Sequence, residues 1–193
     1  MARTASFDRS IVVRAAMDVF WSTGYEGAGI ADLERATGLR RSSIYNSFGS
    51  KRGLFDTAVE QYLDDVIRPR LQPLSGPEVA PGAIVAYLEG LSAALADPAS
   101  LSARSGCMLI NSAGSPIGHD AAVAATVTAY RSELREALGR GIEARLPTLD
   151  ARAADRLADA CTGQVVAALA LARIDSASAS AAIDTALALI EAA

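Results

Sequence analysis

Residues 38–51 read Gly-Leu-Arg-Arg-Ser-Ser-Ile-Tyr-Asn-Ser-Phe-Gly-Ser-Lys, and this stretch decides the fold of the first third of the chain. The glycines near its two ends predict a helix of only about six or seven residues, which is unstable alone in water because helix nucleation is costly. Its polar residues are Arg, Ser, Tyr and Asn, whose side chains bond phosphates and base edges. The combination predicts the recognition helix of a helix-turn-helix.

The side chains of this short helix divide between two faces. Ile44 is expected to point inward, and Phe48 to close the far end of the helix. Side chains at neighbouring positions and one turn apart share one side of a helix. The outward side therefore consists of Arg41, Ser42, Tyr45 and Asn46.

Apolar residues at helical spacing predict further helices on both sides of this stretch. Upstream, we expect one helix over residues 8–24 and another over residues 30–37. Downstream, Ser50 is expected to cap a fourth helix over residues 51–68. The pattern predicts a helix-turn-helix DNA-binding domain at 8–50, followed by this connecting helix.

A change in composition follows the fourth helix. Residues 69–82 contain prolines at 69, 73, 77 and 81, which predicts a Pro-rich linker. Residues 83–193 again show apolar residues at helical spacing, and no stretch has the alternation of a strand. We expect an all-α fold of about nine helices in two domains.

Charge is distributed unevenly along the chain. Residues 1–52 carry eight lysines and arginines against five acidic residues, although the whole chain has a net charge of −4. A basic N-terminal segment on an acidic body fits local contact with DNA. Signal peptide and membrane-spanning patterns are not apparent, which predicts a cytoplasmic location.

The sequence gives little support to catalysis or metal binding. The two cysteines are far apart and His119 is the one histidine, so a zinc site is not expected. We find no pattern of a nucleophile with its base and no phosphate-binding loop. We therefore expect neither an enzyme nor a cofactor.

The N-terminal pattern resembles the TetR/AcrR family of bacterial transcriptional regulators over about residues 8–65. The resemblance implies three small DNA-binding helices, a fourth connecting helix, and a larger helical domain for effector binding and dimerisation. The matching residues are Val19-Phe20, Gly24-Tyr25-Glu26-Gly27, Ile30-Ala31-Asp32-Leu33, Ala36-Thr37-Gly38-Leu39, Ser43-Ile44-Tyr45-Asn46-Ser47-Phe48, Ser50-Lys51 and Leu54-Phe55.

Carried over to this sequence, the resemblance assigns contacts with double-stranded operator DNA. Arg41 is the first choice for reading guanine. Asn46 is expected to contact phosphate or sugar and is also suited to reading adenine. Lys51 resembles the residue that clamps a phosphate at the start of the fourth helix. The basic N-terminal residues Arg3 and Thr4 are expected to reach the adjacent backbone or minor groove. The full set of expected contacts is Arg40, Arg41, Ser42, Ser43, Tyr45, Asn46 and Lys51.

The sequence departs from the family pattern in two places. Ala28 and Gly29 stand where Thr-Ser is usual, so the second helix is expected to have a weak cap. Arg40 stands where a small capping Ser is common, and an added arginine there would strengthen phosphate binding or shift the operator sequence.

The resemblance implies a small-molecule effector and a homodimer formed by the last two helices. Small residues there, Ala158, Gly163, Ala167, Ala168, Ala172, Ala182 and Ala186, are expected to face outward and to allow close approach of a second subunit. Adaptable side chains are expected to line the effector cavity. The candidates are Tyr62, Tyr87, Leu88, Met108, Asn111 and Tyr130.

The leading interpretation is a ligand-responsive repressor released from a palindromic operator. Cys107, near Arg104 and a helix start, makes a thiol-redox-sensing regulator an alternative. A helical interaction module that does not bind DNA is a second alternative, and the choice between repressor and activator stays open.

Overall fold

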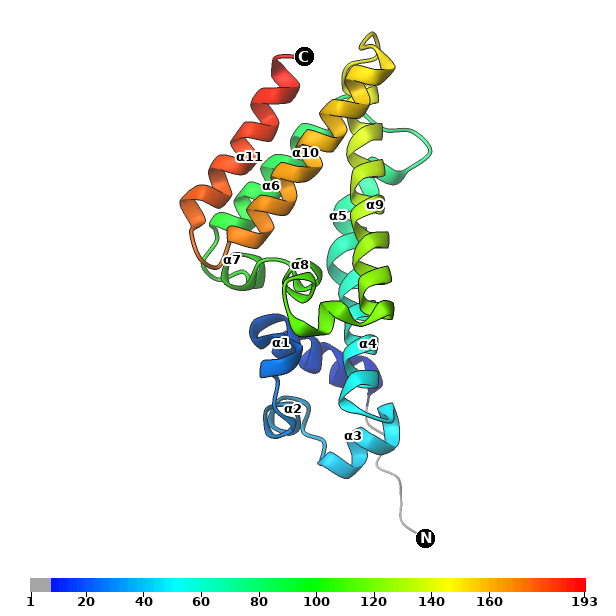
Figure 1. Ribbon diagram of the computed structural model, residues 1–193, viewed down its shortest axis with the longest axis vertical. Coiled ribbons are helices and arrows are strands. Elements are labelled where there is room, and N and C mark those ends of the chain that lie inside the picture. The colour runs from blue at the N-terminus through cyan, green and yellow to red at the C-terminus, as the bar shows by residue number, and fades with distance from the viewer. Residues whose placement is uncertain (1–7) are drawn as a thin grey trace. The chain divides into compact units, whose positions relative to one another are not determined.

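The computed structural model describes residues 8–193, and within this range the chain is helical without any strand (Figure 1). It divides into two compact units, Met1–Val66 and Ile67–Ala193. The predicted contacts of Arg3 and Thr4 lie outside the described residues. Within the described range, no helix is both long enough and apolar enough to cross a membrane.

The N-terminal unit consists of four helices around a small apolar core. These are α1 (Arg9–Gly27), α2 (Ile30–Thr37), α3 (Arg41–Phe48) and α4 (Lys51–Tyr62). The Phe55 ring meets the Phe20 and Tyr25 rings edge-on, with centroids 5.2 and 5.1 Å away. These contacts join α1 to α4, so the longer helices form the frame on which α2 and α3 are placed.

The C-terminal unit is built from longer helices, with α10 packed between α9 and α11. Its helices are α5 (Arg68–Ser75), α6 (Ala83–Ala96), α7 (Leu101–Ser105), α8 (Met108–Ala113), α9 (Ala121–Arg145), α10 (Ala151–Leu171) and α11 (Ser176–Glu191). A π-helical segment, Leu63–Ile67, precedes α5, and a 3-10 turn, Pro116–His119, precedes α9. In Figure 1 α6, α10 and α11 run alongside one another.

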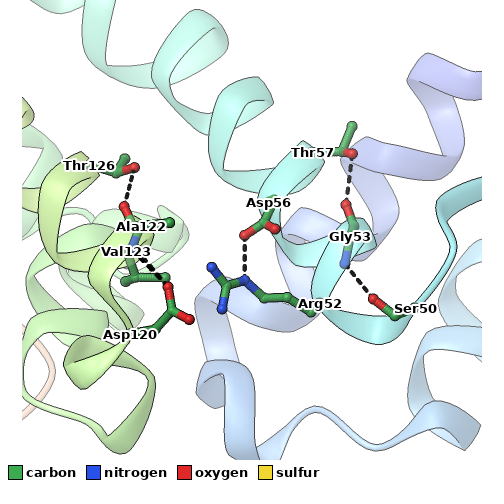
Figure 2. Close-up of polar contacts among 9 residues, drawn as sticks. All are labelled: Ser50, Arg52, Gly53, Asp56, Thr57, Asp120, Ala122, Val123 and Thr126. Atoms are coloured by element: carbon green, nitrogen blue, oxygen red, sulfur yellow. Dashed lines mark hydrogen bonds and ion pairs between the residues drawn. The ribbon is translucent and has the colours of Figure 1, made fainter.

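Side-chain caps fix the starts of several helices, as the sequence predicted. The Ser50 hydroxyl accepts a hydrogen bond of 2.9 Å from the Gly53 amide at the start of α4 (Figure 2). The Asp120 carboxylate accepts hydrogen bonds from the Ala122 and Val123 amides at the start of α9. These bonds satisfy amides that have no partner within the helix itself.

The linker predicted over residues 69–82 is shorter in the structure, because α5 continues to Ser75. Pro69 occupies the first turn of α5, where a missing amide hydrogen costs little. Pro73 lies inside the helix, but Leu71 and Leu74 are buried and α5 packs against α9. Packing therefore outweighs the proline penalty. Neither α5 nor the short α7 was predicted from the sequence, for which about nine helices were expected.

Polar side chains of α9 bond both α5 and α10. Arg140 of α9 donates hydrogen bonds to the Ser75 and Gly76 carbonyls, at the C-terminal end of α5. Arg135, on the same helix, bonds Asp159 at 2.7 Å and Asp155 at 3.1 Å on α10. Such exposed ion pairs add little stability each, but they fix the register between neighbouring helices.

Replacing Phe55 with alanine should destabilise the N-terminal unit by about 3–5 kcal/mol, because the ring is fully buried among other aromatic rings. Urea unfolding followed by the fluorescence of Trp21, which lies in the same unit, measures the change. The control is Tyr45→Ala at an outward position, which should change stability by less than about 1 kcal/mol. A loss below that value in Phe55→Ala would contradict the assignment of this core.

Candidate functional site

The recognition helix predicted from the sequence is α3, and glycines end both helices of the turn. Gly38 has a φ of 69° and ends α2, and Gly49 has a φ of 76° and ends α3. Residues other than glycine rarely adopt this backbone conformation, which glycine reaches without strain. Between them, α3 buries Ile44 and Phe48, as predicted.

The start of α3 is capped from another helix. Arg40 is the N-cap residue but makes no capping bond with its side chain. Instead, the Glu34 carboxylate of α2 accepts a hydrogen bond of 2.6 Å from the Arg41 amide. A negative charge at this end also interacts favourably with the helix dipole. Glu34 therefore replaces the small capping residue that is missing at position 40.

The end of α3 is held by a positive charge from α1. The Arg9 guanidinium lies over the Phe48 ring, 4.5 Å from its centroid, and donates a hydrogen bond of 3.3 Å to the Ser47 carbonyl. A cation at a helix C-terminus is favourable for the same electrostatic reason that an anion is favourable at the start. Sequence reasoning missed both Arg9 and Glu34, because their partners lie on other helices.

The outward side of α3 carries the predicted polar residues. Arg40, Arg41, Ser42 and Asn46 are exposed, Tyr45 is 36% exposed, and Ser43 is half-buried. The Arg41 guanidinium lies over the Tyr45 ring at 5.4 Å from its centroid. Among the described residues, the polar groups of Ser42, Tyr45 and Asn46 side chains have no hydrogen-bond partner. The surface thus offers donors and acceptors to an outside partner.

The start of α4 adds a second basic position. The Lys51 ammonium lies 4.5 Å from the centroid of the Tyr25 ring, and the residue is half-buried. Arg52 is paired with Asp56 at 2.7 Å, one turn along the helix (Figure 2). The ring of Tyr25 restricts the Lys51 side chain at the N-terminus of α4, an arrangement suited to a phosphate.

The second helix begins without a side-chain cap, as the sequence predicted. Gly29 is its N-cap residue and has an extended backbone. The Asp32 carboxylate, in the first turn of α2, pairs with Arg35 at 3.0 Å. An acidic residue in the first turn partly replaces a cap through its charge.

The six predicted effector-contacting residues belong to both units of the chain. Tyr62 belongs to the core of the N-terminal unit, where its ring meets Trp21 edge-on at 4.8 Å. In the C-terminal unit Asn111 donates a hydrogen bond to the Ser105 carbonyl, and only Tyr87 lines one of the cavities described below. The remaining three are buried core residues: Leu88, Met108 and Tyr130.

Two cavities of the C-terminal unit have the size of a small-molecule site. One, of ≈ 340 Å³, lies between α5 and α6 and is lined by Arg70 and Tyr87 among others. The other, of ≈ 460 Å³, is lined by residues of α6, α7 and α11, including Leu95, Arg104 and Ser176. Pockets for small molecules usually have volumes of roughly 300–1,000 Å³. Arg70 was not among the residues predicted from the sequence.

Both cysteines are reduced and buried. Cys107 precedes α8 as its N-cap residue and has no exposed surface. Burial raises the pKa of the Cys161 thiol to about 11, so this group is a neutral thiol at pH 7. An oxidant dissolved in water reaches neither sulfur without some opening of the structure.

The small residues of the last two helices were predicted to face outward, and most of them do not. They are buried inside the chain because α10 and α11 pack closely on each other, and only Gly163 and Ala167 keep appreciable exposure. The large apolar residues Ile174 and Leu189 are exposed, at 75% and 37%. The buried small residues are Ala158, Ala168, Ala172, Ala182 and Ala186.

Comparison with known proteins defines the class of this chain. The model of the family described as "Bacterial regulatory proteins, tetR family" matches residues 12–58. The HTH-type transcriptional regulator YezE of Bacillus subtilis is 35% identical over 143 residues, which are 74% of this chain and 72% of that protein. These matches define a helix-turn-helix transcriptional regulator rather than an enzyme.

Solved structures of TetR-family regulators have the same fold as this chain over nearly its whole length. A cysteine mutant of the TetR-family regulator CifR, complexed with operator DNA, is 29% identical with a TM-score of 0.79, covering 96% of this chain and 98% of that chain. A TetR regulator from Chloroflexus aurantiacus is 28% identical with a TM-score of 0.75, covering 93% and 92%. The chain therefore belongs to the TetR family of bacterial transcriptional regulators.

Replacing Glu34 with alanine should loosen the start of α3, because the Arg41 amide loses its partner. Loss of a helix cap typically costs about 0.5–2 kcal/mol. Hydrogen exchange measured by NMR should therefore quicken at the amides of Ser43 and Ile44, which bond to the carbonyl of Arg40. In Glu60→Ala, an exposed position on α4, these rates should stay unchanged. Equal rates in Glu34→Ala and the native protein would argue against the cap.

Proposed function

We propose that this protein is a ligand-responsive repressor that binds a palindromic DNA operator as a homodimer in the cytoplasm. The observation that carries the proposal is α3, a short helix held at both ends with its polar side chains directed outward. A small molecule that binds better to a conformation unable to bind the operator would release the DNA, through differential affinity for two states.

We assign base reading to the N-terminal part of α3, which is the part that reaches base edges in this class of motif. Arg41 would read guanine through two parallel hydrogen bonds, and its stacking on Tyr45 would limit the freedom of the guanidinium. Asn46 would contact phosphate or adenine. Arg40, Ser42, Ser43, Tyr45 and Lys51 complete the proposed contact surface with the DNA backbone.

The operator complex of CifR supports DNA binding by the present chain, since the two chains share their fold over almost their full length. CifR is described there as bound to double-stranded operator DNA. The two proteins are 29% identical, so the proposal carries over the mode of binding and not the operator sequence.

We propose that α10 and α11 form the homodimer interface. The exposed Ile174 and Leu189 would be covered by the same helices of a second subunit, and Gly163 and Ala167 would allow their close approach. A twofold dimer places two recognition helices on half-sites about one DNA turn apart, which is why the operator is expected to be palindromic.

Thiol sensing through Cys107 is the second candidate. The complete burial of this side chain favours a small-molecule effector, because a dissolved oxidant needs a local opening to reach the sulfur. Oxidant-induced release of DNA that disappears in Cys107→Ser would favour the thiol mechanism. Identical release in both proteins would exclude Cys107 as the sensor.

Titration against the DNA upstream of the protein's own coding region tests DNA binding and its residues. We expect Arg41→Ala to weaken binding by about 1–3 kcal/mol, or roughly five- to 150-fold, and Tyr45→Ala to weaken it less. Affinity should fall steeply as salt rises, because phosphate contacts release counterions. The control is Arg145→Ala, an exposed position at the C-terminal end of α9.

Two results would argue against this assignment of DNA binding. Affinity equal to that for random DNA would mean that α3 does not read this sequence. If the protein bound no DNA at all, or bound DNA with an affinity that does not change with salt, the interaction-module alternative would be favoured.

Replacing Leu189 with arginine should dissociate the proposed dimer, because a charged side chain would be buried against its own copy. Light scattering on a size-exclusion column should then give a mass near 19.9 kDa, that of one chain. Ala124→Arg, at an exposed position on α9, should stay dimeric. A native protein that elutes as a monomer, or an unchanged dimer in Leu189→Arg, would contradict this interface.

A further inference from the structure

The cavity between α5 and α6 combines a rigid apolar wall with two polar side chains. Pro69 and Pro73 of α5 and Leu91 of α6 form part of the wall, and Arg70 and Tyr87 supply the polar groups. Both helices are held in place independently of any ligand, α5 by its packing on α9 and α6 by its packing on α11. The cavity is therefore a preformed feature of the unit.

Arg70 is a half-buried cation without a counterion in the described part of the chain. Its Nη2 donates a hydrogen bond of 3.1 Å to the hydroxyl of Ser102, a serine that is only 2% exposed. Among residues 8–193, no carboxylate forms an ion pair with its guanidinium. An anion that enters the cavity would supply the counterion that this half-buried guanidinium lacks and would form a charge-assisted hydrogen bond with it.

Tyr87 supplies a neutral hydrogen-bond donor beside this cation. Burial raises the pKa of the Tyr87 phenol far above its ordinary value; the Arg70 charge opposes this shift and the Cys107 thiol adds to it. Arg70 and Tyr87 line the same cavity, on α5 and α6 respectively. At neutral pH the phenol keeps its proton and can donate it in a hydrogen bond.

We propose that this cavity binds a small organic acid, whose carboxylate bonds to Arg70 and Tyr87 while its apolar part lies against the proline and leucine wall. A carboxylate is favoured because its two oxygens match the fork of a guanidinium. The volume of ≈ 340 Å³ limits the ligand to a small molecule. The inference rests on the proposed function, in which this acid is the effector that releases the operator.

Isothermal titration of the full-length protein with matched acids and amides tests the proposal. Benzoate and hexanoate serve as acids, benzamide and hexanamide as their neutral counterparts, and inorganic phosphate as an anion without an apolar part. We expect at least one acid to bind tenfold or more tightly than both its amide and phosphate. This comparison uses the native protein, so it does not depend on the folding of any variant.

Variants then locate the site. Arg70→Gln should weaken acid binding by about ten- to a hundredfold, and Tyr87→Phe by about two- to tenfold, as expected for charged and neutral hydrogen bonds. Arg173→Gln, an exposed arginine outside the cavity, should bind as the native protein does. Thermal unfolding without ligand confirms that each variant is folded before it is titrated.

The outcomes distinguish failure of the cavity proposal from failure of the proposed repressor function. Acids that bind no better than amides or phosphate, or that bind folded Arg70→Gln with native affinity, overturn the cavity proposal even where operator DNA is bound normally. Acid binding that leaves DNA affinity unchanged overturns the effector role. Acid binding of the expected kind in a protein that binds no DNA would support the cavity and reject the proposed repressor.

Discussion

Opposite charges from two other helices hold the ends of α3, and the candidate DNA surface depends on them. Glu34 of α2 bonds the first amide of α3, and Arg9 of α1 bonds a carbonyl in its last turn. An eight-residue helix has too few internal hydrogen bonds to persist alone. Ile44 and Phe48 are buried in the core, and the two charges fix the direction of the helix. The outward side chains are therefore not needed to hold the helix in place.

In the C-terminal unit, α5 is also short, contains a proline, and is held in place by contacts with other helices. Its buried leucines supply the attachment, and Arg140 of α9 satisfies carbonyls where the helix ends. Arg70, near the start of the same helix, is not among these contacts. Its side chain instead bonds Ser102 and lies at the cavity. In both units, contacts at helix ends leave functional side chains available.

The parts of the fold that depend on local signals could be predicted from the sequence. Ser50 caps α4, Gly38 ends α2, and Ile44 points inward, because each role follows from residue type and spacing. Roles that depend on distant partners could not be predicted, including the cap from Glu34. An apolar helical face predicts burial but does not distinguish a packed core from a cavity wall. Met108 and Tyr62, which were predicted to contact a ligand, are buried, as either role requires.

The cap from Glu34 has a consequence for how such a protein can change its target. When residue 40 itself caps the helix, a substitution there alters both folding and DNA recognition. Here α2 supplies the cap, so side chains of different size and charge at position 40 leave the helix start intact. Under the proposed mode of DNA binding, a mutation at position 40 would then change operator recognition without disturbing the start of the helix.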